Sequence, residues 1–288
     1  IIVLDKNTGE LLAMDNVPVP FVYHGQWSSP VLYEAGDEPL VIYPDAYGFM
    51  HAFRVPEAGA QTEETAEEDG DDMPILEVAW SVDACPKDYR VDEEGKPVEY
   101  EVKRHAKETG KPKSAIPAPS EIIATPTVAN GFIYIALGRD QNHGPVRGAV
   151  SCFDPRTLDE NGNPERVWIY KELTTTMGSP AVADGVCYLP TTGSLEEPRA
   201  ARLHALDAET GEPLWQIDIG RHLYTSPLVH NGLIYMSAQG RFYVLEAGRE
   251  QPEVLGQSRL DSTATPVIED GVIYTSGRRK LQAHELPQ

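Results

Sequence analysis

A pattern of eleven residues recurs four times along the chain and restricts its fold more than any other feature. Each copy begins with a small residue, Ser or Thr, and Pro, continues through apolar residues to an Asn-Gly or Asp-Gly pair, and ends on Tyr. A looser copy covers residues 28–43. Such self-similarity is typical of stacked copies of one structural unit. The four copies are ATPTVANGFIY (124–134), GSPAVADGVCY (178–188), TSPLVHNGLIY (225–235) and ATPVIEDGVIY (264–274).

Each copy has the composition of two short strands joined by a tight turn. Asn-Gly and Asp-Gly tolerate the positive φ angles that a two-residue hairpin requires. The Pro lies at the start of the first strand, where it costs no ladder hydrogen bond. We expect a third strand after each copy, at 49–54, 149–154, 202–207, 241–246 and 280–284, and a fourth at 76–82, 166–170, 213–218 and 253–260.

Four antiparallel strands per repeat are typical of the blades of a β-propeller. The prolines of the pattern lie at 126, 180, 227 and 266, so their spacings are 54, 47 and 39 residues, which average near the roughly 40–50 residues of known blades. The sequence therefore predicts an all-β fold, with residues 1–288 forming a single propeller domain. The third strands share a column of small residues, as neighbouring blades require: Val3, Ala52, Cys152, Ala205, Val244 and Ala283.

The stretch from Ala205 to Trp215 carries the most specific motif. Its residues Ala205, Asp207, Thr210, Gly211 and Trp215 match the pattern A-x-D-x-x-T-G-x-x-x-W. In physical terms, Asp207 caps a turn, Gly211 gives its positive-φ exit, and the Trp215 indole can pack across blades. This motif resembles the repeat of the quinoprotein (PQQ) alcohol dehydrogenase-like propellers. Residues 24–30 and 121–126 look similar to the BamB-like branch of that family.

The resemblance implies a periplasmic or otherwise exported protein that is eight-bladed and non-enzymatic. Five blades and a half are recognisable here, because residues 1–5 and 11–15 read as the last two strands of a preceding blade. We therefore expect an eight-bladed parent whose first two and a half blades are missing from this chain. In the alternative, residues 10–15 supply the fourth strand of the last blade and close a five-bladed ring.

The charge of the chain limits its partners. It has 24 Lys and Arg residues and 45 Asp and Glu residues, which gives a net charge of -21. Such a surface repels phosphate, so we expect neither nucleic acid nor anionic membrane as a partner. No apolar run approaches the roughly 18 residues of a membrane span, so no membrane insertion is expected. Protein partners, cationic ones in particular, fit this charge.

Two insertions interrupt the repeats, at 56–74 and 84–119. The first is strongly acidic and reads as a mobile loop. Its run Asp69-Gly-Asp-Asp72 lacks the order of an EF-hand, so no metal site is predicted there. The second insertion has mixed charge and fits a flap, an arm for a partner, or a solvated loop.

The three cysteines, Cys85, Cys152 and Cys187, are well separated in the sequence. Cys152 and Cys187 fall on apolar columns and are predicted to pack in the core, whereas Cys85 lies in a loop and has no assigned role. The quinoprotein dehydrogenases that this repeat resembles carry an adjacent cysteine pair over the cofactor, and none occurs here. We therefore expect neither PQQ nor calcium.

Propeller geometry brings the links from fourth to first strands, and from second to third strands, to one face. The candidate ligand- or partner-binding residues all lie in such links, near the channel mouth. We predict a non-catalytic, protein-binding or scaffolding propeller of the cell envelope. The alternatives are a dehydrogenase that uses PQQ and calcium, and the sensor domain of a larger receptor. The candidate site consists of His24, Gln26, Trp27, Glu121, Asp140 and His143.

Overall fold

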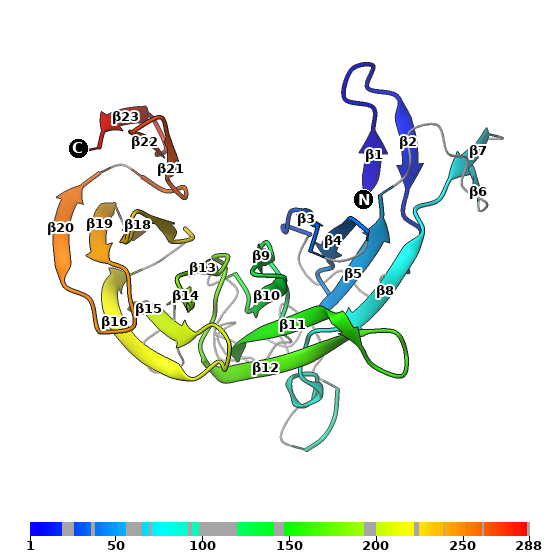
Figure 1. Ribbon diagram of the computed structural model, residues 1–288, viewed down its shortest axis with the longest axis horizontal. Coiled ribbons are helices and arrows are strands. Elements are labelled where there is room, and N and C mark those ends of the chain that lie inside the picture. The colour runs from blue at the N-terminus through cyan, green and yellow to red at the C-terminus, as the bar shows by residue number, and fades with distance from the viewer. Residues whose placement is uncertain are drawn as a thin grey trace, which may run out of the picture.

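Antiparallel β-sheets stand side by side in an open arc, each with its first strand inside and its last strand outside (Figure 1). This computed structural model describes residues 1–288 except 19–25, 36–37, 56–64, 69–70, 92–93, 98–119, 141–146, 193–199, 222–224, 239, 261 and 287–288. The described residues contain strands and one short 3-10 turn, η1 (Lys87–Tyr89). No helix among them is long and apolar enough to cross a membrane. The expected all-β fold is confirmed.

Four sheets have four strands each, and we call them the first to fourth blades. A fifth blade has three strands. The first two blades are β3 (Val31–Tyr33), β4 (Leu40–Pro44), β5 (Phe49–Arg54) and β8 (Val78–Asp83), then β9 (Thr127–Ala129), β10 (Phe132–Leu137), β11 (Gly148–Leu158) and β12 (Pro164–Leu173).

The next two blades repeat this order. They are β13 (Ala181–Ala183), β14 (Val186–Thr192), β15 (Ala200–Asp207) and β16 (Pro213–Arg221), then β17 (Leu228–His230), β18 (Leu233–Ala238), β19 (Arg241–Glu246) and β20 (Val254–Arg259). The fifth blade consists of β21 (Val267–Glu269), β22 (Val272–Ser276) and β23 (Leu281–Glu285).

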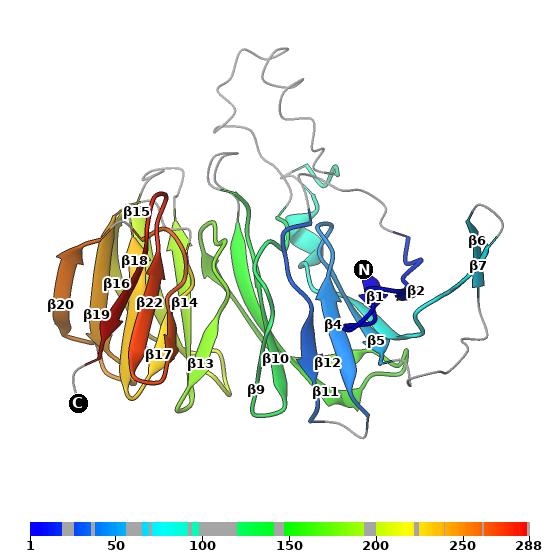
Figure 2. The same ribbon diagram turned by 90° about the horizontal axis from the view of Figure 1, so that it is seen from above.

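The hairpin turns have the predicted geometry. Each Asn or Asp of the repeated pattern has a positive φ between 48° and 53°, and the Gly after it has a φ between 73° and 80°. Both central residues of each turn are therefore in the left-handed region, as a type I′ turn requires. These turns lie on one side of the molecule, and η1 lies toward the opposite side (Figure 2).

Tryptophan side chains join consecutive blades. Trp168 Nε1 of the second blade donates to the carbonyl of Ala208 in the third, and Trp215 Nε1 of the third donates to that of Gly248 in the fourth, both at 3.0 Å. Gly211 has a φ of +74°, and a Cβ atom there would lie 2.5 Å from the Trp168 ring. The motif from Ala205 to Trp215 thus receives one indole and supplies the next.

A belt of hydrogen bonds from the Ser or Thr before each repeat Pro also links the blades. In each bond the backbone N–H of one blade donates to the hydroxyl of the next blade. We call this series the Ser/Thr belt, and it explains the Ser/Thr-Pro pair of the repeat. Its bonds run from Ser29 to Thr125 (3.1 Å), Thr125 to Ser179 (3.0 Å), Ser179 to Ser226 (2.8 Å) and Ser226 to Thr265 (2.9 Å).

Removal of one belt hydroxyl should weaken the fold measurably. Ser179→Ala deletes the acceptor for the Thr125 N–H, so we expect a loss of about 1 kcal/mol in unfolding free energy. Chemical denaturation would measure it. Ser258→Ala, on an exposed part of β20, should change the unfolding free energy by less than about 0.5 kcal/mol. Equal effects of the two variants would contradict the role of the belt.

The predicted small column and the packing of two cysteines are confirmed. Ala52, Cys152 and Ala205 are at most 1% exposed, and each lies opposite a Trp of the fourth strand. Cys187 is fully buried. Burial raises the pKa of the Cys152 thiol to about 12 and that of Cys85 to about 11, so neither thiol is reactive near neutral pH. Cys85, which had no assigned role, is buried after β8.

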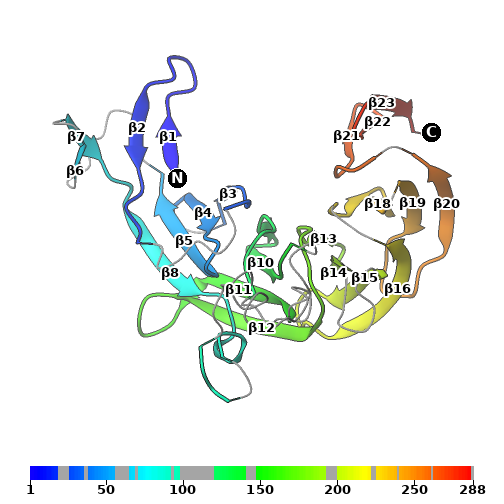
Figure 3. The same ribbon diagram turned by 180° about the vertical axis from the view of Figure 1, so that it is seen from behind.

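The two ends of the arc lie on either side of its opening (Figures 1 and 3). β1 (Ile2–Leu4) and β2 (Leu11–Met14) pair with each other, as predicted for the last two strands of a blade. They lie at the opposite end of the arc from β23, so the five-bladed closure is not formed. The number of eight blades in a longer parent stays a prediction.

The acidic insertion at 56–74 contains more order than a loop. β6 (Thr65–Glu68) and β7 (Asp71–Pro74) form a hairpin, so the prediction of a loop is wrong for these strands. The hairpin leads into a bridge between Met14 and Ile75 and a hydrogen bond from the Leu76 N–H to the Met14 carbonyl, 2.8 Å long. The residues directly after β7 therefore pair with the N-terminal sheet through their backbone. The acidic composition of the segment did not indicate this pairing.

Candidate functional site

Glu121 lies at the entry to the second blade and is held there by its backbone. Its N–H donates to the Gly138 carbonyl at 2.6 Å, and the Gly138 N–H donates back at 2.9 Å. This pairing brings the Glu121 side chain beside Arg139, with 3.5 Å between Oε1 and Nε. The side chains of Glu121 and Arg139 are 0% and 1% exposed, so the two charges form a buried pair.

Burial changes the acidity of Glu121. Loss of solvation raises the pKa of its carboxyl to about 7, Asp140 adds to the rise, and the Arg139 guanidinium opposes it. Within the described part of the chain, neither carboxylate oxygen of Glu121 has a hydrogen-bond partner. Glu121 is therefore a buried carboxyl that changes its charge near neutral pH, a property that is enriched at functional sites.

Gln26 and Trp27 lie on the segment before β3. The Tyr43 hydroxyl donates to Gln26 Oε1 at 2.9 Å, and the Ser28 hydroxyl donates to the Ala124 carbonyl at 3.0 Å. Hydrogen bonds on both sides thus hold the segment in place. The Trp27 side chain is 61% exposed, so a large aromatic side chain faces solvent from a fixed backbone.

The structure brings together part of the predicted site. Glu121 and Asp140 interact electrostatically, and Arg139 joins them. Gln26 and Trp27 lie on the adjacent blade, whose Ser28 contacts Ala124 shortly after Glu121. His24 and His143 lie outside the described residues. Sequence reasoning missed Arg139, although its position directly before Asp140 in the same link was a usable signal.

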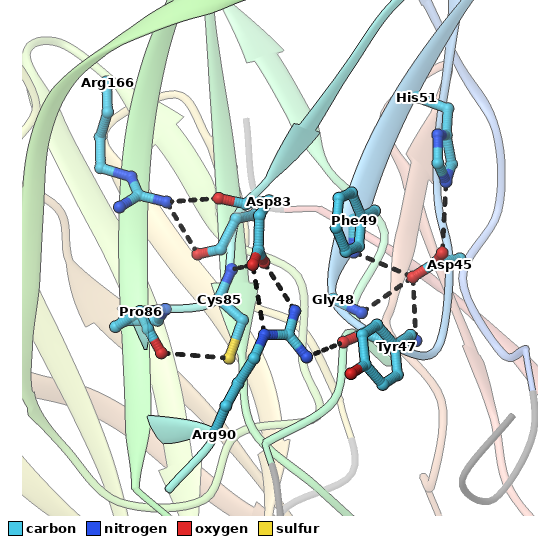
Figure 4. Close-up of polar contacts among 11 residues, drawn as sticks. Asp45, Tyr47, Gly48, Phe49, His51, Asp83, Cys85, Pro86, Arg90 and Arg166 are labelled. Atoms are coloured by element: carbon cyan, nitrogen blue, oxygen red, sulfur yellow. Dashed lines mark hydrogen bonds and ion pairs between the residues drawn. The ribbon is translucent and has the colours of Figure 1, made fainter. Parts of the chain in front are cut away.

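A second polar cluster, also missed, lies within the first blade (Figure 4). Asp45 Oδ1 accepts from the N–H groups of Tyr47, Gly48 and Phe49 at 2.8–2.9 Å, while Oδ2 lies 3.2 Å from His51 Nε2. His51 Nδ1 lies 2.8 Å from the Ser81 hydroxyl. Because Asp45 and His51 are 1% and 4% exposed and Asp45 caps a turn, this Asp-His-Ser chain stabilises the blade.

Arginines clamp the start of the second insertion between two blades (Figure 4). Arg90 Nη2 donates to Asp83 Oδ1 at 2.6 Å, and Arg90 Nη1 donates to the Tyr47 carbonyl at 3.0 Å. From the second blade, Arg166 Nη2 donates to the carbonyls of Asp83 and Ala84 at 2.9 and 3.0 Å. The chain therefore enters residues 91–119 from an anchored position near the second blade.

No group of three or more His, Cys, Asp or Glu side chains is placed to hold a metal ion in the described ranges. Cys85 after β8, Cys152 in β11 and Cys187 in β14 are free thiols. These residues do not reproduce the adjacent cysteine pair of the dehydrogenases. The expectation that neither PQQ nor calcium binds stays a prediction.

The four-stranded antiparallel sheets are arranged radially and are joined by Trp contacts and the Ser/Thr belt, so they are blades of the β-propeller type. A family model described as outer membrane protein assembly factor BamB matches residues 146–281. Over these residues the chain carries repeats similar to those of the PQQ-like β-propellers. No curated protein matches the chain.

Solved structures share this fold at low sequence identity. The crystal structure of BamB from Moraxella catarrhalis is 14% identical, with a TM-score of 0.50 over 98% of this chain and 77% of that one. The computationally designed protein Ika8 is 12% identical, with a TM-score of 0.54 over 99% of this chain and 64% of that one. A chain of the mitotic checkpoint complex is 10% identical, with a TM-score of 0.51 over 86% and 59%. Such likeness establishes the fold alone, because one fold serves many functions.

Proposed function

We propose that the chain is a non-catalytic, protein-binding propeller of the cell envelope. The match to the family model described as outer membrane protein assembly factor BamB supports this class of function. The net charge of -21 favours cationic partners, and the encounter rate would fall with rising salt. An exported, periplasmic location follows from the same family resemblance.

The observation that carries the proposal is the exposed indole of Trp27. Hydrogen bonds at Gln26 and Ser28 hold its segment, so little conformational entropy would be lost when a partner covers the ring. Tryptophan is enriched among the residues that dominate binding energy at protein interfaces. Trp27 supplies an exposed aromatic anchor, and Asp140 on the next blade supplies a half-buried acidic side chain.

Trp27→Ala should weaken partner binding at least about tenfold, a loss of about 1.4 kcal/mol or more. Partners would be captured on the immobilised protein from an envelope extract, identified, and their affinities measured by titration. Leu32→Ala is the matched control, because Leu32 is 50% exposed on the neighbouring β3 and should leave affinity unchanged. Retention of full affinity by Trp27→Ala would contradict the assigned site. Stoichiometric quinone and calcium in the purified protein would contradict the non-catalytic class.

A further inference from the structure

Two arginines face each other at one end of the fourth blade. Arg241 begins β19 and Arg259 ends β20, and the two residues are directly opposite in the antiparallel register. Such side chains lie on one face of the sheet, with Cβ atoms about 4.5–5.5 Å apart, and like charges there are destabilising. Both arginines are exposed, and no described residue forms an ion pair or hydrogen bond with either side chain. The stability of the fold therefore does not explain this pair.

The third blade has an acid where the fourth has Arg259. Arg202 of β15 is equivalent to Arg241, because each lies three residues before the small-column residue of its strand, and Arg202 faces Asp218 in the register. These two side chains form an ion pair of 2.9 Å between Nε and Oδ1. In the first blade, Asp83 occupies the same place and also pairs with an arginine. Arg259 thus reverses a charge that completes an ion pair in other blades.

The second blade shows how a basic residue at this place is satisfied. Lys171 is the equivalent of Arg259, and Arg147 lies directly before β11 at the same end of the blade. Both contact Asp88, with Nζ and Nη1 at 2.8 and 3.4 Å from its carboxylate oxygens. The hydrogen bond from Lys171 holds the pKa of the Asp88 carboxyl below its usual range. Because Asp88 belongs to η1, outside the sheet of this blade, two bases here hold a carboxylate that a separate segment supplies.

We propose that Arg241 and Arg259 bind an acidic segment of a partner protein. One Asp or Glu carboxylate of that segment lies between the two guanidinium groups, as Asp88 lies between Lys171 and Arg147 in the second blade. Arginine suits this role because its planar guanidinium donates paired hydrogen bonds to carboxylates. The bound carboxylate also offsets the repulsion between the two arginines.

A peptide segment fits this surface better than a nucleic acid or an anionic membrane does. Those polyanions present many charges over a large area, and a chain with a net charge of -21 repels them. A short segment can stay within a Debye length of the two arginines, roughly 8 Å at physiological salt. The surface lies on the fourth blade, whereas Trp27 precedes the first strand of the first blade. The inference therefore goes beyond the proposed function and does not rest on it.

A labelled hexa-aspartate peptide tests the site. Titration of the whole chain at physiological salt, followed by fluorescence anisotropy, should give saturable binding. Hexa-asparagine has nearly the same shape without the charges and should bind at least about tenfold more weakly. Absence of saturable binding, or equal binding of the two peptides, overturns the proposal.

Arg259→Asp should change binding and stability in opposite directions. The new carboxylate pairs with Arg241 and repels the peptide, so affinity for hexa-aspartate should fall at least about tenfold. The same substitution recreates the Arg-Asp row of the third blade, so the midpoint of denaturation should rise. Arg259→Gln, which only removes the charge, should reduce affinity about threefold to tenfold. A lower denaturation midpoint for Arg259→Asp would show that Arg259 serves the fold and would overturn the assignment.

Lys6→Asp is the matched control for net charge. Lys6 is exposed between β1 and β2, and its substitution changes the net charge as much as Arg259→Asp does, yet peptide affinity should be unchanged. Equal losses from the two variants would show that only the overall charge matters. Tighter binding of phosphatidylglycerol vesicles than of the peptide would assign the arginines to a membrane instead, and either result overturns the proposal. Trp27→Ala should leave peptide affinity unchanged, so failure at one surface is distinguishable from failure at the other.

Discussion

Trp215→Ala should lower the free energy of unfolding by about 3–5 kcal/mol, the range measured for truncation of a buried Trp. The Trp215 side chain is 8% exposed, packs against Tyr188, and donates to the Gly248 carbonyl of the next blade. Its removal opens a cavity between two blades and leaves a partly buried carbonyl without its donor. Both effects weaken the same interface.

Denaturant titration monitored by circular dichroism would measure this loss. Trp27→Ala removes the same side chain from a position that is 61% exposed, so its effect should stay within about 0.5 kcal/mol. A loss below about 1 kcal/mol for Trp215→Ala would show that Trp215 does not anchor the interface.

Protonation of Glu121 should make the protein more stable in mild acid than in mild base. Burial raises the pKa of its carboxyl from 4.5 to about 7, so between these values the folded state binds more protons than the unfolded state. Unfolding free energy therefore falls as pH rises through this window, and it is constant with respect to this group above pH 7. The shift corresponds to about 3 kcal/mol.

Glu121→Gln isolates this contribution, because Gln has nearly the same shape and does not titrate. The difference in unfolding free energy between Glu121→Gln and the wild-type protein should grow in favour of the variant from pH 4.5 to 8. Glu160→Gln, at an exposed position, should give no such trend. A difference that is independent of pH would show that Glu121 is solvated or ionised throughout.

The blades could be predicted from the sequence because each repeat carries its own turn and strand signals. Asn130 with Gly131, and the pairs equivalent to it, fix hairpins through backbone sterics alone. The column through Ala52, Cys152 and Ala205 is small because a Trp from the fourth strand lies opposite it. These constraints act locally and recur in every blade, so pattern reasoning could find them.

The candidate site was less predictable because its contacts join different links and blades. Arg139 contacts Glu121 only after two links meet through the Gly138 backbone pair. Likewise, Arg166 reaches Asp83 across a blade boundary. The partners of side chains at such junctions depend on how neighbouring links and blades are positioned in space. The spacing of the repeats along the sequence does not specify these positions. The hairpin of β6 and β7 was missed because the acidic composition of this segment indicated a loop, whereas its backbone pairs as two strands.

The Ser/Thr belt has a consequence for how such a chain determines its size. Each hydroxyl accepts from one neighbour and each N–H donates to the other, so a blade recognises only the blades beside it. Energies of this nearest-neighbour kind add along the array, as in linear repeat proteins. No single blade therefore determines how many blades the array contains. Whole repeats can be gained or lost in evolution without redesign of the remaining interfaces, and only the two blades that meet at the closing seam must adapt.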